Sequence, residues 1–361
     1  MKNNFKKSFK KKKILITGHT GFKGSWLTLW LSSLGAKVYG ISLNIPTKPS
    51  NFETLKLHKK CTSGNLNINN LSALKKKILK IKPDYIFHLA AQALVKKSYD
   101  DPINTFQSNT VGTLNLLESL KFLKKKCTVI LITSDKSYKN LELKRGYKET
   151  DILGGHDPYS ASKAAAEIII QSYIHSFFKK KNNNVSIGIA RAGNVIGGGD
   201  WSHNRLIPDC VKSWSKNKKV QIRNPLSTRP WQHVLEALGA YLMFSISLRK
   251  NKKLHGEIFN FGPSKKNNNN VIQLVKKMSK YWKKVSWQIS RENKNFYESN
   301  LLKLNCEKAN KLLKWKTFLN FNETATITSE WYRDFYKKKI DMTKLSLKQI
   351  QDYEKKIYKH L

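Results

Sequence analysis

The sequence of 361 residues contains little cysteine. Its four cysteines lie far apart, and none forms the C-x-x-C spacing of a metal or redox site: Cys61, Cys127, Cys210 and Cys306. This pattern argues against a disulfide framework and a metal centre, and it is typical of reduced structural thiols. We therefore expect a cytoplasmic protein without a metal.

Long apolar runs are also missing, since none reaches the ~18 residues of a membrane span. Residues 1–13 are basic, but a strand and a glycine loop follow them where a secretory signal would have an apolar core. We expect no membrane insertion, and we interpret residues 1–12 as a basic disordered tail with a loose attraction to polyanions.

Acidic residues are scarce, with 24 Asp and Glu against 68 Lys and Arg, which gives a net charge of +44. One interpretation is a footprint for nucleic acid or an anionic membrane. The other is a coding bias toward Lys and Asn on an ordinary enzyme surface. Only eight of the basic residues are arginine, whereas proteins that read nucleic acid use arginine for bidentate contacts. The composition therefore favours coding bias and no specific nucleic acid.

The apolar segments predict an α/β fold. Short apolar runs at 14–17, 37–41, 84–90, 128–133 and 185–190 alternate with helical patterns at 26–34, 71–81, 104–123 and 160–178. This alternation indicates βαβ units and a Rossmann-type doubly wound parallel sheet. It ends after Arg191. We expect an NAD-binding Rossmann domain over residues 13–191 and a smaller mixed C-terminal substrate domain over residues 192–361, interleaved with Rossmann elements.

A glycine loop separates the first expected strand from the first expected helix. Gly18, Gly21 and Gly24 would allow a tight turn and let backbone N–H groups approach a pyrophosphate at the helix N-terminus. Incidental glycines in a strand-to-helix turn are the alternative. An acidic residue usually follows ~20 residues later to bind the ribose. Here Asn44 offers a neutral acceptor, so these residues leave NAD and NADP open.

Tyr159 and Lys163 form a Y-x-x-x-K pair on one helix face. A nearby ammonium lowers the pKa of a phenol, which suits Tyr159 to take a proton from a sugar hydroxyl. Ser134, at the end of an expected strand, could bond the same hydroxyl. Asp135 and Lys136 follow it at the sheet edge where such folds place ligands. They are either a solvated loop pair or an acid and a base for an elimination.

Four of the few arginines fall in one segment: Arg191, Arg205, Arg223 and Arg229. Planar bidentate donors suit phosphate groups, so we expect a clamp for the diphosphate of a nucleotide-activated substrate, with chance clustering as the alternative. His88 lies within an expected buried strand and His19 within the glycine loop, and we interpret both as structural histidines.

Several stretches resemble the extended short-chain dehydrogenase/reductases, and among them the CDP-glucose 4,6-dehydratases. The most specific are ITGHTGFKGSWLTLWL (16–31), ITSDKSY (132–138), GGHDPYSASKAAAE (154–167), RAGNVIGGGDW (191–201) and IRNPLSTRPWQHVLE (222–236). The resemblance covers most of the chain from about residue 12. Related dTDP-glucose and GDP-mannose dehydratases carry Glu after the Asp, whereas this chain has Lys136, as the CDP-glucose enzymes do.

The resemblance implies site residues as well as a fold. It implies an NAD site formed by Gly18, Thr20, Gly21, Phe22, Lys23, Gly24, Ala90 and Gln92, with Tyr159 and Lys163. It implies catalysis by Ser134, Asp135, Lys136, Tyr159 and Lys163, and a CDP site at Asn194, Arg205, Leu206, Ile207, Arg223 and Arg229. Asn44 and Asn65 belong to the same cofactor site, but the family usually has Asp at the position of Asn65 and often at that of Asn44, so each asparagine keeps an acceptor and loses a charge.

These residues imply dehydration of CDP-glucose to CDP-4-dehydro-6-deoxy-glucose, in a pathway to deoxysugars of surface polysaccharides such as O-antigen lipopolysaccharide. Tyr159 would accept the 4-hydroxyl proton, Lys136 would remove the C5 proton, and Asp135 would protonate the leaving 6-hydroxyl. The helices at 104–123 and 160–178 resemble the family's dimer-forming pair, so a homodimer or homotetramer is expected. Two alternatives remain: another nucleotide-sugar dehydratase or epimerase, and a polyanion-binding protein on an inactive dehydratase scaffold.

Overall fold

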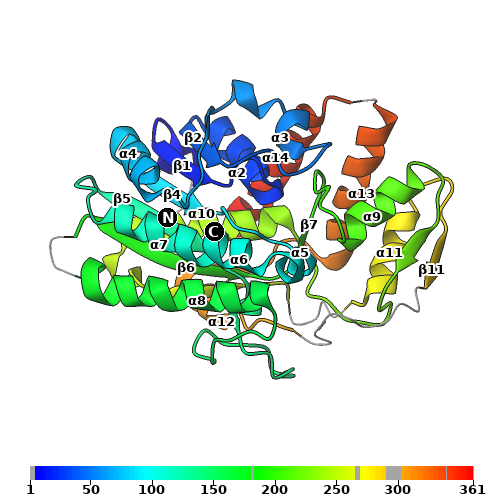
Figure 1. Cartoon of the computed structure of the whole chain (residues 1–361). Coiled ribbons are helices and arrows are strands. Elements are labelled where there is room, and N and C mark those ends of the chain that lie inside the picture. Colours follow the sequence, from blue (N-terminus) through cyan, green and yellow to red (C-terminus); the bar gives the residue numbers. More distant parts are fainter. Residues whose placement is uncertain (1–4, 180–182, 265–268, 290–301, 339, 361) are drawn as a thin grey trace.

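The structure, a computed structural model, describes residues 5–179, 183–264, 269–289, 302–338 and 340–360 (Figure 1). A seven-stranded sheet organises the chain, with the strand order β10-β6-β5-β4-β1-β2-β3 and parallel pairing throughout. Its strands are β1 (Lys13–Thr17), β2 (Lys37–Ser42), β3 (Thr62–Asn65), β4 (Tyr85–His88), β5 (Cys127–Ile132), β6 (Val185–Ala192) and β10 (Ile258–Phe261). The predicted doubly wound parallel sheet is confirmed.

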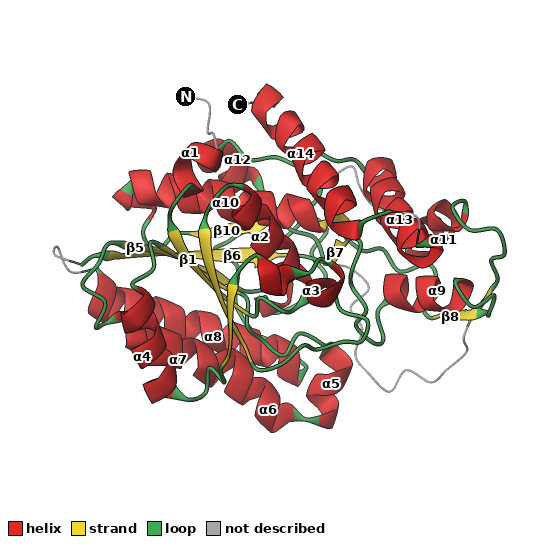
Figure 2. Cartoon of the chain, turned by 90° about the horizontal axis from the view of Figure 1, so that it is seen from above, coloured by secondary structure: helices red, strands yellow, loops and turns green. Residues whose placement is uncertain are grey.

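The central strands are apolar on both faces because helices cover both faces of the sheet. In β5, Ile130 and Ile132 join one hydrophobic core, and Val129 and Leu131 join the other. The first core contains side chains of α2 (Phe22–Ser33), α10 (Val234–Lys250), α12 (Glu307–Leu313) and α14 (Met342–His360). The second contains those of α4 (Leu71–Ile81), α7 (Gly112–Leu120) and α8 (Pro158–Tyr173), on the opposite side of the sheet (Figure 2).

The expected helices are present, two of them with π-helical segments. The helix expected at 104–123 consists of α6 (Pro102–Phe106), η2 (Gln107–Val111) and α7, and the one at 160–178 consists of α8 and η4 (Ile174–Phe178). Five further short helices lie in connections: α3 (Asn51–Thr54), η1 (Leu57–Lys59), α5 (Val95–Asp100), η3 (Asp135–Ser137) and η5 (Lys252–Leu254). No helix within the described ranges is long and apolar enough to cross a membrane.

A smaller mixed lobe lies beside one end of the sheet (Figures 1 and 2). It contains α9 (Leu206–Trp214), α11 (Val271–Ser279), α13 (Phe321–Lys337) and the two-stranded sheet of β8 (Val220–Ile222) with β11 (Trp287–Ile289). A second short pair, β7 (Val195–Ile196) with β9 (Gln232–His233), adjoins the main sheet. Since α10 and β10 return to the main sheet, the C-terminal half is interleaved with the Rossmann elements, and the boundary at residue 191 stays a prediction.

The expected disordered tail is wrong for residues 5–12. Residues 5–9 form the helix α1 (Phe5–Phe9), and the side chains of Phe5 and Phe9 are fully buried. Phe5 packs edge-on against Trp30, with ring centroids 5.7 Å apart, and its N–H donates to the Tyr358 hydroxyl at 3.1 Å. Burial of two aromatic rings outweighs the solvation of the neighbouring lysines. Residues 1–4 lie outside the described ranges.

Candidate active site

The predicted site residues converge at the C-terminal edge of the sheet. The strands β1, β4, β5 and β6 are adjacent and parallel, so their carboxyl ends lie at the same edge of the sheet. The segments that follow these strands leave the sheet at this edge. The glycine loop follows β1, the Ser134–Lys136 cluster follows β5, and Tyr159 begins α8. Open α/β sheets bind their ligands at this edge.

The three glycines of the loop serve different purposes. A Cβ at Gly18, where φ is +75°, would lie 2.7 Å from the Ala90 nitrogen, and one at Gly24 would lie 2.1 Å from the Gly18 carbonyl oxygen. These two positions need glycine for the turn and for packing. A Cβ at Gly21 would meet only the Gly18 oxygen at 3.4 Å, and Gly21 begins α2 without a side-chain cap. An uncapped helix N-terminus approached by a bare backbone fits a dinucleotide pyrophosphate.

Side chains next to this loop hold it against β2 and β3. The His19 ring lies between two hydroxyls, with Nδ1 2.9 Å from Ser42 Oγ and Nε2 2.7 Å from Ser63 Oγ. Thr20 Oγ1 donates to the Asn44 carbonyl at 2.6 Å. His19 is therefore structural, as expected. The side chains of Asn44 and Asn65 are exposed at the ends of β2 and β3, where a ribose and an adenine would lie.

His88 is also structural. Its side chain is 3% exposed, with Nδ1 2.7 Å from Thr17 Oγ1 and Nε2 3.2 Å from Thr113 Oγ1. Burial lowers the pKa of His88 to about 3, so the ring is neutral. Gln92 likewise uses its amide within the chain, donating to the Leu94 carbonyl and accepting from the Leu94 N–H at 2.7 Å. Gln92 thus braces the loop after β4.

Ser134 and Asp135 form a buried hydrogen-bonded pair. Ser134 Oγ donates to Asp135 Oδ1 at 2.9 Å and accepts from the Lys136 N–H at 3.2 Å. Asp135 is 4% exposed. Burial raises its pKa, and the charges of Lys136 and Lys23 and the Ser134 bond only partly oppose the rise. Burial therefore favours the protonated form of Asp135, which is the form that a general acid needs. A small cavity beside Lys136 is lined by His156, Asp157 and Ser160 among others.

Tyr159 and Lys163 project from the first turns of α8, which Asp157 caps by accepting from the Ser160 N–H at 2.9 Å. Both side chains are buried. Burial raises the pKa of Tyr159, against the effect of a hydrogen bond with Ser134, so the expectation of a lowered pKa is wrong for the chain alone. Burial lowers the pKa of Lys163 to about 8, and the Glu167 charge opposes this. Desolvation of the phenolate outweighs the nearby charges.

Lys23 connects the three parts of the site. Burial lowers its pKa to about 8, and the charges of Arg205 and Lys163 lower it further, while Asp135 and Asp200 raise it. An ammonium that interacts with all four groups must lie between the glycine loop, the proton-transfer cluster and the substrate segment. The site therefore places cations where a dinucleotide and a nucleotide diphosphate would both come close.

The expected arginine clamp is wrong for Arg191, and for Arg205, Arg223 and Arg229 it stays a prediction. Arg205 precedes α9, and its Nη1 lies 3.1 Å from Asp200 Oδ2. Arg223 follows β8 on the surface, and burial raises the pKa of Asp209 in α9 while the nearby charge of Arg223 partly opposes this rise. Arg191 is 1% exposed and pairs with Glu167 of α8, so it cannot reach a substrate.

The remaining expected substrate residues lie along the same lobe. Ile207 is buried in the first turn of α9, beside the half-buried Leu206. The Asn194 carbonyl accepts from the Gln232 N–H at 3.3 Å, which joins the segment after β6 to β9. Arg229 is half-buried beside residue 269, whose carbonyl accepts its N–H at 3.3 Å.

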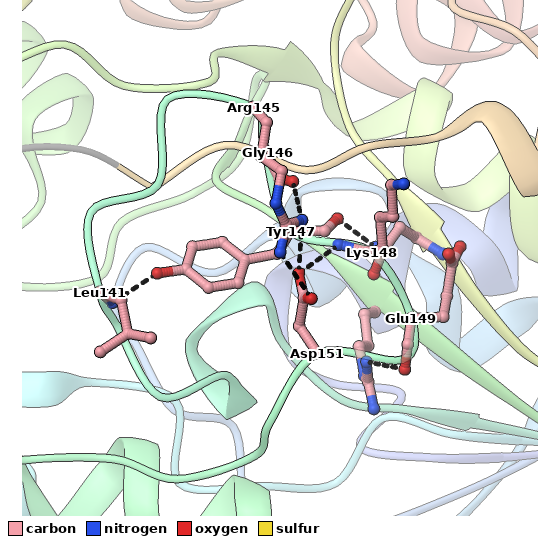
Figure 3. A network of polar contacts seen from close by, with 9 residues as sticks. Leu141, Arg145, Gly146, Tyr147, Lys148, Glu149 and Asp151 are labelled. Carbon is pink, nitrogen blue, oxygen red and sulfur yellow. Dashed lines mark hydrogen bonds and ion pairs between the residues drawn. The ribbon is translucent and has the colours of Figure 1, made fainter.

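A network of polar contacts fixes the segment between Lys136 and Tyr159 (Figure 3). Arg145 donates to both carboxylate oxygens of Asp151 at 2.8 and 2.7 Å. The Glu149 carboxylate accepts from the Asn260 N–H at 2.8 Å, and its carbonyl accepts from Arg191 at 3.2 Å. Arg191 thus anchors this segment to β6.

Sequence reasoning missed Gly193 as a residue of this site. A Cβ at Gly193 would lie 3.2 Å from Asp135 Oδ2. Glycine therefore leaves room for the carboxyl. The motif Arg191-Ala192-Gly193-Asn194 contained the signal, but only the fold shows which side chain the glycine faces.

Comparison with known proteins identifies relatives over nearly the whole chain. The family described as GDP-mannose 4,6 dehydratase matches residues 15–328. A CDP-glucose 4,6-dehydratase of Salmonella typhimurium is 42% identical over 346 residues, which cover 95% of this chain and 96% of that protein. A dTDP-D-glucose 4,6-dehydratase of Dictyostelium discoideum is 32% identical over 69% of this chain and 58% of that protein.

Solved structures share the fold. An epimerase of Methanothermobacter thermautotrophicus is similar with a TM-score of 0.78 and 23% identity, over 93% of this chain and 97% of that one. A dTDP-glucose 4,6-dehydratase from Bacillus anthracis, determined in complex with NAD, has a TM-score of 0.72 and 22% identity, over 90% of this chain and 97% of that one. These likenesses confirm the Rossmann-type architecture.

Proposed function

Because the chain belongs to the GDP-mannose 4,6-dehydratase family of the extended short-chain dehydrogenase/reductases, we propose that it dehydrates CDP-glucose to CDP-4-dehydro-6-deoxy-glucose with NAD as a retained cofactor. The observation that carries the proposal is the buried Asp135, which shares a hydrogen bond with Ser134 and lies near Tyr159. An epimerase needs no such acid. The likeness to the Salmonella protein named CDP-glucose 4,6-dehydratase supports CDP-glucose as the substrate.

The cofactor would lie against Gly18, Thr20, Gly21, Phe22, Lys23 and Gly24, with Asn44 and Asn65 toward its adenosine end and Ala90 toward its middle. When bound, NAD⁺ would accept a hydride from C4 of the sugar and later return it to C6. The uncapped N-terminus of α2 and the ammonium of Lys23 would offset the charge of the pyrophosphate. Lys163 would hold the nicotinamide ribose beside Tyr159.

Tyr159 would accept the proton of the 4-hydroxyl. Its raised pKa favours the neutral phenol in the chain alone, so proton transfer relies on the hydrogen bond with Ser134 and on the charge of Lys163. Oxidation of C4 makes the C5 proton acidic, because the resulting carbanion is α to a carbonyl. Lys136 would take that proton, and Asp135 would give its own proton to the leaving 6-hydroxyl.

The nucleotide would bind in the smaller lobe, against Asn194, Arg205, Leu206, Ile207, Arg223 and Arg229. The product would feed deoxysugars of surface polysaccharides such as O-antigen lipopolysaccharide, and the protein would act in the cytoplasm. A homodimer or homotetramer, formed through the helices that contain α7 and α8, fits this proposal.

Incubation with CDP-, dTDP-, GDP- and UDP-glucose would test the function. We expect a 4-keto-6-deoxy product from CDP-glucose and no net reduced nicotinamide. Asp135→Asn keeps the volume of the side chain and removes the acid, so it should stop water loss. A stable 4-keto-glucose with stoichiometric reduced nicotinamide from the wild-type protein would mean that the chain is a simple dehydrogenase, and a C4 epimer as the product would mean an epimerase.

A further inference from the structure

The buried hydroxyl of Tyr241 has no role in the mechanism proposed above. Tyr241, in the middle of α10, is 0% exposed, and its hydroxyl has no hydrogen-bond partner within the described part of the chain. A buried hydroxyl without a hydrogen-bond partner destabilises the folded state. Native structures contain few such groups, and a catalytic role is one of the recognised explanations.

The direction of α10 brings this hydroxyl toward the site. The helix begins beside β9 at the C-terminal edge of the sheet and ends at the opposite edge, where Arg249 donates to the Asp84 carbonyl at 2.9 Å. Side chains on a helix lean toward its N-terminus. The Tyr241 side chain therefore leans toward the edge that carries Ser134 and Tyr159.

Small residues of β6 let α10 pack closely against the sheet. A Cβ at Gly188 would lie 2.2 Å from Phe244, one turn after Tyr241 on the same helix. Further along β6, Ala190 and Ala192 face the same core as Tyr241. The Tyr241 ring packs at 70° against Phe261 of β10, with centroids 6.2 Å apart.

The charges of Tyr159 and Asp135 act on the Tyr241 hydroxyl, which agrees with the direction of the helix. Burial raises the pKa of Tyr241, and the charges of Tyr159 and Asp135 raise it further. The phenol therefore stays protonated and acts only as a neutral donor near both groups. The amide of Gln232 also has a buried atom without a hydrogen-bond partner. Its Nε2 donates to the Phe261 carbonyl at 3.1 Å, whereas its Oε1 has no hydrogen-bond partner among the described residues.

Asp135 needs an additional hydrogen-bond donor only after it has given up its proton. In the elimination, Lys136 takes the C5 proton and the C5–H electron pair forms the C5=C6 bond. The C6–O bond breaks with its electron pair on oxygen, which takes the Asp135 proton and leaves as water. Asp135 then carries a negative charge in a site where it is 4% exposed, and a buried carboxylate is costly without donors.

We propose that Tyr241 is a positioning residue for the elimination, whose hydroxyl donates a hydrogen bond that stabilises the charge developing on Asp135. The proposal rests on the dehydratase function above. Ser134 already donates to Oδ1, and Gly193 leaves Oδ2 open. A donor that is unpartnered before the reaction and used during it stabilises the transition state more than the ground state, and only that difference accelerates a step.

Tyr241→Phe tests the proposal, because it removes the hydroxyl and keeps the ring. We expect kcat for CDP-glucose to fall about 10- to 100-fold, since one donor to a developing charge is lost, with KM within about twofold. The Tm should stay the same or rise, because an unpartnered buried hydroxyl is removed. In a single turnover, reduced nicotinamide should accumulate, since C4 oxidation proceeds and water loss is slow.

Tyr353→Phe is the matched control. Tyr353 is also buried, but its hydroxyl donates to Glu236 Oε2 at 2.8 Å, away from the candidate site. This variant should lower the Tm and leave kcat unchanged.

Two results would overturn the assignment of Tyr241: a wild-type kcat in Tyr241→Phe, whatever its Tm, or slow turnover without accumulation of reduced nicotinamide. The last result would mean that the hydroxyl serves Tyr159. A wild-type protein without dehydratase activity would refute the proposed function itself, so the two failures can be told apart.

Discussion

The N-terminal helix α1 should stabilise the fold although its sequence is rich in lysine. Phe9 is 0% exposed, and its ring packs edge-on against Tyr85, with centroids 5.1 Å apart. Replacing a buried Phe by Ala costs about 3–5 kcal/mol, a large part of the ~5–15 kcal/mol that holds a typical domain folded. We expect Phe9→Ala to lower the free energy of unfolding by about 3 kcal/mol, at the low end because a helix at the end of a chain can undock alone.

Urea unfolding monitored by tryptophan fluorescence measures this loss, and a change in midpoint at constant m-value would show that stability itself has changed. The exposed Lys6→Ala is the control, with an expected effect within about 0.5 kcal/mol. KM for CDP-glucose should be the same in both variants at a temperature where both are folded. If Phe9→Ala behaved like Lys6→Ala, α1 would contribute nothing in solution, and the interpretation as a disordered tail would be right.

Three further predictions concern the site and the core. Tyr159→Phe should lower kcat about 10²- to 10⁴-fold while substrate still binds, and activity within about threefold of wild type would exclude Tyr159 as the base. Arg205→Ala should raise KM for CDP-glucose. Arg191→Ala should instead reduce the free energy of unfolding by about 3–5 kcal/mol, because it leaves Glu167 buried and unpaired. Equal effects of the two variants on KM would contradict a binding role for Arg205 and a structural role for Arg191. Burial raises the pKa of Glu236 to about 7. Since this value lies above the unfolded one, the contribution of Glu236 is complete below about pH 4.5 and is lost as the pH rises through about 7, by about 3 kcal/mol. Glu236→Gln should therefore reduce the fall in Tm between about pH 5 and 8, and a Tm profile parallel to that of the wild type would refute the assignment.

Local patterns predicted five of the seven strands, all except β3 and β10, and the helices between them, because those signals lie within one segment. Buried parallel strands appear as short apolar runs, and the helix expected at 71–81 is found at the same residues. The strand β3 was not predicted because its four residues, TSGN, are polar and lie at the edge of the sheet. The helix α1 did carry a signal, since Phe5 and Phe9 are four residues apart and share a helix face, but the surrounding lysines obscured it.

The sequence predicted which residues meet at the candidate site better than it predicted their pKa values. Order along the chain brought Ser134, Asp135 and Tyr159 into one site, and the fold places them at one sheet edge. Arg191 was misassigned because sequence proximity to Arg205 does not show which face of β6 a side chain occupies. The raised pKa of Tyr159 was not predictable either, because burial depends on the whole fold, whereas the four-residue spacing to Lys163 shows only a neighbouring charge.

The distribution of charge through the fold explains why a net charge of +44 says little about the site. Acidic side chains are scarce, yet the structure buries Asp84, Asp135, Asp157, Glu167, Asp200, Glu236 and Asp334. Among the Lys and Arg side chains of the described ranges, Lys163 and Arg191 are buried and Lys23 is half-buried in the candidate site. The excess of lysine therefore lies on the surface, where salt screens each charge within about 8–10 Å. Inside the fold, burial and the nearest groups set the pairing and the pKa of each carboxyl group. Asp200 pairs with Arg205, and burial raises the pKa of Asp135 despite two nearby lysines. A strongly basic surface and a buried carboxyl with a raised pKa are compatible, because solvent and salt screen the surface charges and burial acts on the carboxyl itself.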